Sequence, residues 1–333
     1  MLRLVGTSDK GLYTSSSIAS GCMLCYAGVK AVIFVTGVCD DSCYYCPVSR
    51  DRLGHDVFYV NEERVHTLEE VLTEVLRTGA RGASITGGDP LIAYPRVTSL
   101  IRMLKDAMGP GFHIHLYTSG RYATIEALKG LDRAGLDEIR FHPTQEEFED
   151  RIRDAVRHTS MDVGVEIPIS PRLVEWAKRV IYKAWTSGAH FVNLNEMEFA
   201  EPNAPALLAR GCRESRRRPF TVEGSYEAAL EVLEWARENT GIPVHFCPAS
   251  FKDSIQTRNR MRRAASLDRA WHEVETGDGT LRWYEADCPG GPVKAPSPGY
   301  LEGCRRIRLV EAHPTRARTP RIQEQVIEVQ APL

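Results

Sequence analysis

Short apolar runs alternate with longer amphipathic stretches through most of this chain. The apolar runs are typical of strands buried on both faces, and we expect six or seven of them, drawn from residues 31–36, 83–86, 113–118, 138–142, 163–169, 191–197 and 243–247. The stretches between them place apolar residues three or four positions apart, which predicts helices at 62–78, 95–108, 122–134, 145–158, 173–186 and 226–239. Strands that alternate with helices form right-handed βαβ units, so the sequence predicts an α/β fold with a parallel sheet.

Polar and chemically reactive residues recur just after these strands. Barrel enzymes keep their active sites at that carboxyl-terminal rim, and the sequence contains no GxGxxG phosphate loop. We therefore expect a partial, open TIM-type (β/α)6 barrel, with a flavodoxin-like or Rossmann sheet as the alternative.

The chain divides into three parts by its pattern. Residues 1–29 form an N-terminal extension, residues 30–267 the barrel and residues 268–333 a small β-rich appendage. The other expected features are strands at 280–285, 306–311 and 325–329, a Pro- and Gly-rich loop at 288–303, a long excursion at 201–224 and a basic helix at 254–267.

Composition narrows the class of protein. The chain has 333 residues, 43% of them hydrophobic and 26% charged, as in a soluble globular protein. A formal net charge of −2 gives no overall indication of nucleic-acid binding. No apolar run approaches the ~20 residues of a membrane span, and the N-terminus lacks a signal peptide's pattern, so we expect a cytoplasmic protein with no membrane partner. In a reducing compartment, nine cysteines argue for metal ligation over disulfides.

Three cysteines follow the first expected barrel strand. Cys39, Cys43 and Cys46 are spaced C-x3-C-x2-C, with an aromatic residue just before the last of them. Three thiolates in so short a loop can converge on one face of an iron–sulfur cluster and leave one iron open to another ligand. The alternatives are a structural zinc site, which prefers four ligands, or unrelated core cysteines.

This loop resembles the signature of the radical S-adenosylmethionine (SAM) superfamily. The resemblance implies that Cys39, Cys43 and Cys46 hold a [4Fe–4S] cluster, that SAM chelates its open iron, and that SAM is cleaved reductively to methionine and a 5′-deoxyadenosyl radical. It also implies an oxygen-sensitive enzyme that needs an external electron donor, such as reduced ferredoxin or flavodoxin.

The second motif follows the next strand. Gly87-Gly88-Asp89-Pro90 resembles the Gly-Gly-Glu-Pro motif of the superfamily, with Asp in place of the more common Glu. The resemblance implies that the backbone here binds the amino group of SAM and that the glycines use positive φ angles to let it approach. Ser119, after the third strand, corresponds to a polar position that often contacts SAM in the family.

Later strands supply further candidates for the cofactor site. Glu166 lies in a segment that resembles a proline motif of the glycyl-radical activating enzymes, and it either faces a cavity or forms a salt bridge inside the barrel. Arg140 and His142 alternate on the fourth strand and share one face, as do Asn193 and Asn195 on the sixth. We expect both asparagines to line the barrel interior, with Asn195 among the cofactor-binding residues.

The order of these motifs over about residues 20–265 resembles archaeal radical SAM proteins related to pyruvate formate-lyase activating enzymes. The resemblance indicates the cofactor and the fold of this protein more firmly than the reaction that it catalyses. The substrate therefore stays unidentified. The alternatives are activation of a glycyl-radical enzyme and modification of an RNA, a peptide or a small metabolite. The arginines that could bind phosphates are Arg213, Arg216, Arg217 and Arg218, together with those between 258 and 263, although acidic neighbours favour an ordinary solvated surface.

A second metal site is expected from Cys22, Cys25 and Cys247. The first two form a C-x2-C pair, a common two-ligand unit for zinc or an iron–sulfur cluster, and Cys247 ends the last barrel strand. His245 or an open position would complete the site. The alternative is that these are ordinary buried cysteines. The remaining cysteines, Cys212, Cys288 and Cys304, have less support as ligands.

Overall fold

The computed structural model describes residues 5–7, 11–13, 18–144 and 148–326. Its main sheet contains seven parallel strands, which lie side by side in chain order: β3 (Lys30–Phe34), β6 (Gly82–Thr86), β7 (His113–Thr118), β8 (Glu138–Phe141), β9 (Asp162–Ile169), β10 (Phe191–Glu196) and β11 (Val244–Cys247). The first and last of these strands do not pair with each other, so the barrel is open. The predicted fold class is confirmed, and β11 adds a seventh parallel strand to the six of the expected (β/α)6 unit.

Short antiparallel hairpins cover both edges of this open barrel. The hairpin of β4 (Tyr59–Val60) and β5 (Glu63–Arg64) pairs with β3, and the hairpin of β1 (Val5–Thr7) and β2 (Gly11–Tyr13) pairs with β11. Neither hairpin was predicted. Each gives an exposed edge strand hydrogen-bonding partners, which removes a template for unwanted strand pairing.

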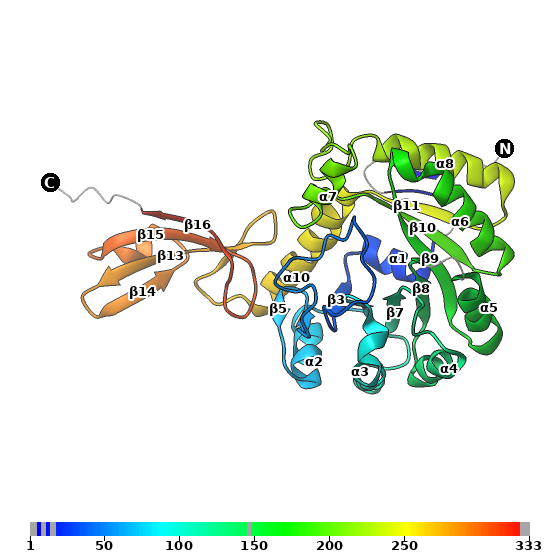
Figure 1. The fold of residues 1–333 in the computed structure, drawn as a ribbon. Coiled ribbons are helices and arrows are strands. Elements are labelled where there is room, and N and C mark those ends of the chain that lie inside the picture. The colour runs from blue at the N-terminus through cyan, green and yellow to red at the C-terminus, as the bar shows by residue number, and fades with distance from the viewer. Residues whose placement is uncertain (1–4, 8–10, 14–17, 145–147, 327–333) are drawn as a thin grey trace.

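Six helices cover the outer face of the sheet (Figure 1): α2 (Leu68–Arg77), α3 (Tyr94–Met108), α4 (Ile125–Ala134), α5 (Phe148–His158), α6 (Val174–Thr186) and α8 (Ser225–Asn239). Their apolar faces and the outward side chains of the strands form one continuous core. The helix predicted at 62–78 begins later than expected, because Glu63 and Arg64 pair with β4 and Thr67 caps α2 in a capping box with Glu70. The first residues of the helix predicted at 145–158 lie outside the described residues.

The inner face of the barrel is polar. Because side chains alternate along a strand, every second residue points inward. Those that line the interior cavity are Lys30, Val32, Ser84, Thr86, Tyr117, Arg140, Glu166, Pro168, Asn193, Asn195, His245 and Cys247. The predicted site residues on neighbouring strands therefore project into the same cavity.

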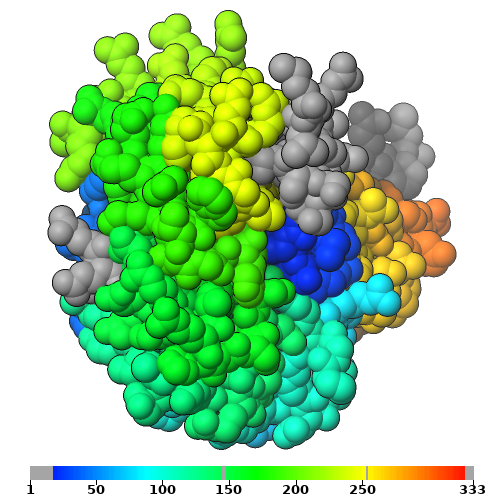
Figure 2. Space-filling model, turned by 90° about the vertical axis from the view of Figure 1, so that its right-hand side faces the viewer, coloured from blue at the N-terminus to red at the C-terminus, as the bar shows by residue number. Residues whose placement is uncertain are grey.

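Helix α1 (Ser20–Tyr26) lies inside the open barrel, which the sequence pattern did not predict. The backbone N–H of Gly21 donates to Glu138 Oε2 at 3.1 Å, and a side chain at Gly21 would collide with inward-facing residues of β7 and β8. Leu24 packs against Gly82 at the start of β6, so α1 fills the amino-terminal part of the barrel. Figure 2 shows the blue N-terminal part of the chain, which includes α1, at the surface between green residues of the barrel and the gold segment that follows β11.

The chain after β11 forms a short helix, α9 (Ala249–Phe251), a π-helical turn (Lys252–Thr257) and α10 (Arg258–Asp268). The helix predicted at 254–267 is therefore π-helical at its start. The excursion at 201–224 contains one short helix, α7 (Ala204–Ala209).

The C-terminal appendage is an antiparallel sheet that projects to one side of the barrel (Figure 1). Its strands are β12 (Val274–Glu275), β13 (Leu281–Cys288), β14 (Gly291–Ala295), β15 (Arg305–Ala312) and β16 (Arg321–Val326). The predicted loop at 288–303 thus contains a strand, because Gly291–Ala295 folds back on β13. Of the strand predicted at 325–329, residues 327–329 lie outside the described residues. Ala265 of α10 packs with Trp283 in the core of this sheet and so joins it to the barrel.

The appendage contains a disulfide bond. Cys288 and Cys304 form a disulfide with an S–S distance of 2.01 Å, so the preference for metal ligation over disulfides is wrong for this pair. The turn after β13 and the start of β15 bring the two residues together.

Within the described ranges, no helix has both the length and the apolar character that a membrane span requires.

Candidate active site

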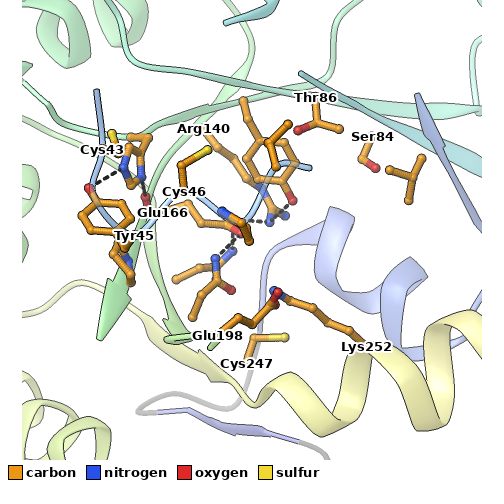
Figure 3. Close-up of a pocket in the computed structure, with 18 of the residues that line it drawn as sticks. Cys43, Tyr45, Cys46, Ser84, Thr86, Arg140, Glu166, Glu198, Cys247 and Lys252 are labelled. Atoms are coloured by element: carbon orange, nitrogen blue, oxygen red, sulfur yellow. Dashed lines mark hydrogen bonds and ion pairs between the residues drawn. The ribbon is translucent and has the colours of Figure 1, made fainter. Parts of the chain in front are cut away.

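A cavity of about 510 Å³ occupies the interior of the barrel. Cys39, Cys43 and Cys46 line it from the loop after β3, and Figure 3 shows Cys43 and Cys46 on one side of the cavity and Cys247 on another. Burial raises the pKa of Cys39 and raises that of Cys43 to about 11. A bound metal would reverse this effect, because it binds the thiolate form.

The spacing of these three sulfur atoms fits a cluster better than a single ion. Among the described residues, the one group of His, Cys, Asp or Glu ligand atoms that all lie within 4.8 Å of one another is His113, His115 and Glu138. Thiolates around one zinc ion lie about 3.8 Å apart, given Zn–S bonds of about 2.3 Å. Thiolates that bind different irons of one cluster stand farther apart. The donor set of the loop therefore suits an iron–sulfur cluster.

Gly87 and Gly88 pack directly against the start of the cysteine loop. The N–H of Gly88 donates to the carbonyl of Thr36 at 2.7 Å, and the N–H of Asp89 donates to the carbonyl of Val38 at 2.9 Å. A Cβ at Gly88 would overlap the carbonyl oxygen of Val38 and lie 2.8 Å from that of Gly37. Neither glycine has a positive φ angle, so that part of the prediction is wrong. Glycine is required at these positions because the backbone of the turn packs against the backbone of the cysteine loop and leaves no room for a side chain.

The Asp89 side chain serves the protein itself. It accepts hydrogen bonds from Thr118 Oγ1 at 2.9 Å, Ser119 Oγ at 2.6 Å, Ser119 N at 3.1 Å and Leu91 N at 3.0 Å. The carboxylate is buried and ties the end of β6 to the end of β7, while Pro90 begins a 3₁₀ turn (Pro90–Ala93). Gly87, Gly88 and Ser119 line the cavity, and the Ser119 hydroxyl is engaged by Asp89.

Two further contacts hold the cysteine loop over the barrel. Tyr45 OH donates to His142 Nε2 at 2.8 Å, and His142 Nδ1 donates to the carbonyl of Glu166 at 2.9 Å. Asp41 accepts from Arg121 and Thr144, both at 3.0 Å. Burial lowers the pKa of His142, which keeps the imidazole neutral in this arrangement. The loop is thus anchored to residues that follow β7 and β8.

Arg140 is the centre of a buried polar network. It donates to Glu138, to Glu166 Oε2 at 2.7 Å and to Tyr117 OH at 3.3 Å, and its Nη2 lies 3.4 Å from Cys22 Sγ. Burial alone would raise the pKa of Glu138, but the Arg140 charge, a hydrogen bond from His113 and the Lys30 charge together outweigh it and lower the pKa to about 2. The predicted shared face of Arg140 and His142 is confirmed, since both line the cavity.

Glu166 and the two asparagines of β10 complete this network. Asn195 Nδ2 donates to Glu166 Oε1 at 2.8 Å, and Asn193 Nδ2 donates to Glu166 Oε2 at 3.1 Å. Asn193 and Asn195 point to the same side, as predicted. Glu166 both lines the cavity and forms a salt bridge with Arg140, so the two interpretations offered for it hold together.

Lys30, His115 and Glu138 are inward-facing residues that the sequence analysis missed. The alternating polar positions of His113, His115 and Tyr117 in β7 were the available signal. His113, His115 and Glu138 are compact enough for a metal ion. Glu138, however, is already paired with Arg140, and Lys30 lies against His115, so two cationic side chains oppose a metal cation there.

The second cysteine group reaches the same cavity. Cys22 and Cys25 of α1 and Cys247 of β11 all line it, and burial raises the pKa of Cys22 to about 11. His245, the predicted additional ligand, contacts Tyr26 OH at 3.1 Å and Asn193 Oδ1 at 3.3 Å.

Several of the arginines considered for phosphate binding are paired. Arg218 binds Glu196 at 2.6 Å, Arg260 binds Glu62, and Arg262 binds Glu275 at 3.2 Å. Arg213, Arg216 and Arg217 are exposed on the excursion. These pairings leave little concentrated positive charge for a nucleic acid.

An open parallel barrel with three cysteines on the loop after its first strand, packed against a Gly-Gly turn after its second, is the arrangement of a radical SAM enzyme. A family model described as the radical SAM superfamily matches residues 33–167. The chain is also 36% identical over 274 residues to a Methanocaldococcus jannaschii protein whose name provisionally describes it as a glycyl-radical enzyme activating enzyme; the match covers 79% of this chain and 72% of that one. The chain therefore belongs to the radical SAM superfamily.

More distant similarities cover smaller parts of the chains or have low identity. A Methanothermobacter thermautotrophicus 5-amino-6-(D-ribitylamino)uracil–L-tyrosine 4-hydroxyphenyl transferase is 30% identical over 159 residues, which is 44% of this chain and 40% of that one. Streptococcus suis SuiB bound to SAM has a TM-score of 0.47 at 10% identity, covering 70% of this chain and 56% of that one. Escherichia coli coproporphyrinogen III oxidase has a TM-score of 0.40 at 11% identity, covering 71% and 59%. The chain spans little more than half the length of these two solved structures, and the likeness is too distant to carry an argument.

Proposed function

We propose that this radical SAM enzyme abstracts a hydrogen atom from its substrate inside the barrel cavity, with its [4Fe–4S] cluster on Cys39, Cys43 and Cys46. The observation that carries this proposal is that the three cysteines, the Gly87-Gly88 backbone and a polar wall of strand residues line one cavity. When the cluster and SAM are bound, they supply reductive cleavage to methionine and the 5′-deoxyadenosyl radical. The chain's own residues position SAM and substrate and exclude water from the cavity.

The test is SAM cleavage by anaerobically reconstituted protein. With dithionite and SAM, the wild type should release 5′-deoxyadenosine. Replacement of Cys39, Cys43 and Cys46 together by Ala should abolish that product, because the thiolates are the proposed anchors. Replacement of Cys212 by Ala serves as the control, since this thiol packs among Met197, Leu207 and Val222 and is not part of the cavity lining. Cleavage that survives in the triple variant would refute the assignment.

We assign SAM binding to the backbone of Gly87, Gly88, Asp89 and Pro90 and to the side chains of Ser119, Glu166 and Asn195. Asn195 uses one amide hydrogen on Glu166, and an amide side chain has a second hydrogen and an oxygen to offer a ligand. Asp89 acts as a positioning residue, because its carboxylate holds Ser119 and the turn around Leu91 in place.

A radical SAM enzyme requires an external reductant, and we propose reduced ferredoxin or flavodoxin. We propose that the carrier presents an acidic docking surface and that the enzyme acts in the cytoplasm. The Arg210 guanidinium lies 4.2 Å from the ring of Tyr44, next to Cys43, and the exposed Arg50 lies beside the same loop. Arg210→Glu should slow flavodoxin-driven SAM cleavage and leave dithionite-driven cleavage unchanged. Arg157→Glu on α5 is the matched control, and equal loss with both reductants would contradict a docking role.

The second candidate function is activation of a glycyl-radical enzyme, in which the abstracted hydrogen belongs to a glycine of a partner protein. The name of the Methanocaldococcus jannaschii relative favours it. The test is electron paramagnetic resonance of a candidate partner after incubation with the enzyme and SAM. A glycyl radical on the partner supports this function. Deuterium transfer from a small substrate into 5′-deoxyadenosine without a protein radical would exclude it.

We also propose a second metal group, either zinc or an iron–sulfur cluster, at Cys22, Cys25 and Cys247. Support comes from their position around the cavity that contains the primary cysteines.

A further inference from the structure

The nine cysteines of the chain fall into distinct environments. Cys39, Cys43 and Cys46 lie on the loop after β3. Cys212 packs among Met197, Leu207 and Val222, and Cys288 is bonded to Cys304. Cys22, Cys25 and Cys247 remain, and all three line the cavity although they come from an N-terminal helix and the last barrel strand. One helical turn separates Cys22 from Cys25, so both lie on the same face of α1.

The spacing of this group favours a cluster over a compact mononuclear site. Cys22 Sγ lies 3.4 Å from Asn193 Nδ2, whereas Cys247 is level with Asn195 in the register of β10 and β11. Two residues along a strand span about 7 Å. Thiolates on one zinc ion would have to approach to about 3.8 Å, and the described sulfur atoms form no such group. The wider spacing suits thiolates on different irons of a cluster.

The surroundings favour thiolates and cluster sulfur. Arg140 Nη2 and Asn193 Nδ2 each lie 3.4 Å from Cys22 Sγ as hydrogen-bond donors. On the other side, Lys252 lies near Cys247 and pairs with Glu198, and Figure 3 shows this pair beside the Cys247 sulfur. Positive groups and N–H donors are what stabilises anionic sulfur in a buried site.

Among the described residues, the nearby groups that could act as a fourth ligand are already engaged: Glu198 pairs with Lys252, and Glu166 pairs with Arg140. Both nitrogens of His245 are engaged, with Tyr26 and Asn193, and the Lys252 ammonium has no lone pair to offer. A cluster held by three cysteines keeps one iron without a protein ligand. Here that iron would face the cavity.

We infer that Cys22, Cys25 and Cys247 hold a second iron–sulfur cluster, whose open iron binds a nitrogen, oxygen or sulfur donor of the substrate. The substrate-binding role rests on the proposed function, because both clusters would then face one cavity. The second cluster orients the substrate for hydrogen abstraction and takes no part in SAM cleavage.

The experiment uses two reconstituted full-length variants, each lacking one set of ligands. The Cys39/Cys43/Cys46→Ala variant should keep about half of the wild-type iron and sulfide. After reduction, the electron paramagnetic resonance signal of the remaining cluster should change when ¹³C-cyanide is added and show a resolved ¹³C coupling. The same signal should not change when SAM is added. The Cys22/Cys25→Ala variant should keep the other half, and its signal should respond to SAM. Cys212→Ala is the control for loss of a buried thiol.

The outcomes separate this inference from the proposed function. A Cys39/Cys43/Cys46→Ala variant that is folded by circular dichroism and free of iron, or that retains zinc instead, overturns the second cluster. Retained iron with a signal that cyanide leaves unchanged overturns the open position. If the Cys22/Cys25→Ala variant fails to respond to SAM while cyanide still binds the other variant, the proposed function fails and the second cluster stands.

Discussion

Tyr45 and His142 join the cysteine loop to the barrel through one hydrogen bond, in which the tyrosine hydroxyl donates to Nε2 of the neutral imidazole at 2.8 Å. Tyr45 immediately precedes Cys46, and His142 follows β8 and donates its other nitrogen to the carbonyl of Glu166. The position of the loop is therefore linked to two neighbouring strands that also carry residues of the cavity wall. We regard this contact as a positioning device for the primary cluster.

Replacement of Tyr45 by Phe should lower the free energy of unfolding of the apo-protein. The change removes a hydroxyl that contacts Cys43 as well as His142, and it leaves His142 Nε2 buried without a donor, which costs about 1–3 kcal/mol. Urea denaturation measures this loss. Tyr44→Phe is the control, because no hydrogen bond of its hydroxyl is found among the described residues. Equal stability of the two variants would show that the contact contributes nothing.

Gly88→Ala should reduce iron retention after reconstitution. The new Cβ would overlap the carbonyl oxygen of Val38 and displace the start of the cysteine loop. Such overpacking costs about 1–3 kcal/mol and here falls on the ligand loop. Iron and sulfide analysis checks this, with Gly111→Ala as the control, because a Cβ there would meet nothing within 4 Å. Full iron content in Gly88→Ala would mean that the loop tolerates the shift.

Asp89→Ala should destabilise the apo-protein by about 3 kcal/mol or more. It removes a buried carboxylate that accepts four hydrogen bonds, and bonds to a charged acceptor are worth about 1.5–3 kcal/mol each. Thermal or urea unfolding gives the value, with Asp106→Ala on the exposed side of α3 as control. If Asp89→Ala unfolds like this control, the carboxylate is not the link between β6 and β7.

His245 should make the apo-protein less stable in mild acid. Burial lowers its pKa from the usual 6.5 to about 4, so the unfolded chain takes up this proton at a higher pH than the folded one. The destabilisation is absent above pH 6.5, grows as the pH falls and reaches roughly 3 kcal/mol near pH 4. His245→Gln should make the stability profile less steep between these values, while the buried His142 and His115, whose pKa values are also lowered, still contribute. His158→Gln at the exposed end of α5 should follow the wild type, and a slope that His245→Gln leaves unchanged would reject the assignment.

The local pattern was sufficient to predict the repeating unit and to point to the cysteine loop that we propose binds the primary cluster. Apolar runs such as that of β7 and amphipathic helices such as α6 follow from spacing along one segment, and their bounds agree within a residue. Cys39, Cys43 and Cys46 lie within one loop, so their convergence needs no knowledge of distant residues. The Gly-Gly-Asp-Pro turn was predicted for the same reason.

What the tertiary structure decided is which distant residues meet. The place of α1 inside the barrel depends on a gap that exists only because β3 and β11 do not pair, and no local pattern reports that gap. The roles of Asp89 and Glu166 likewise depend on partners 29 and 26 residues away, Thr118 and Arg140. The cysteine spacing could suggest ligands because it is local, whereas charge pairing and burial arise from packing between segments that lie far apart in the sequence.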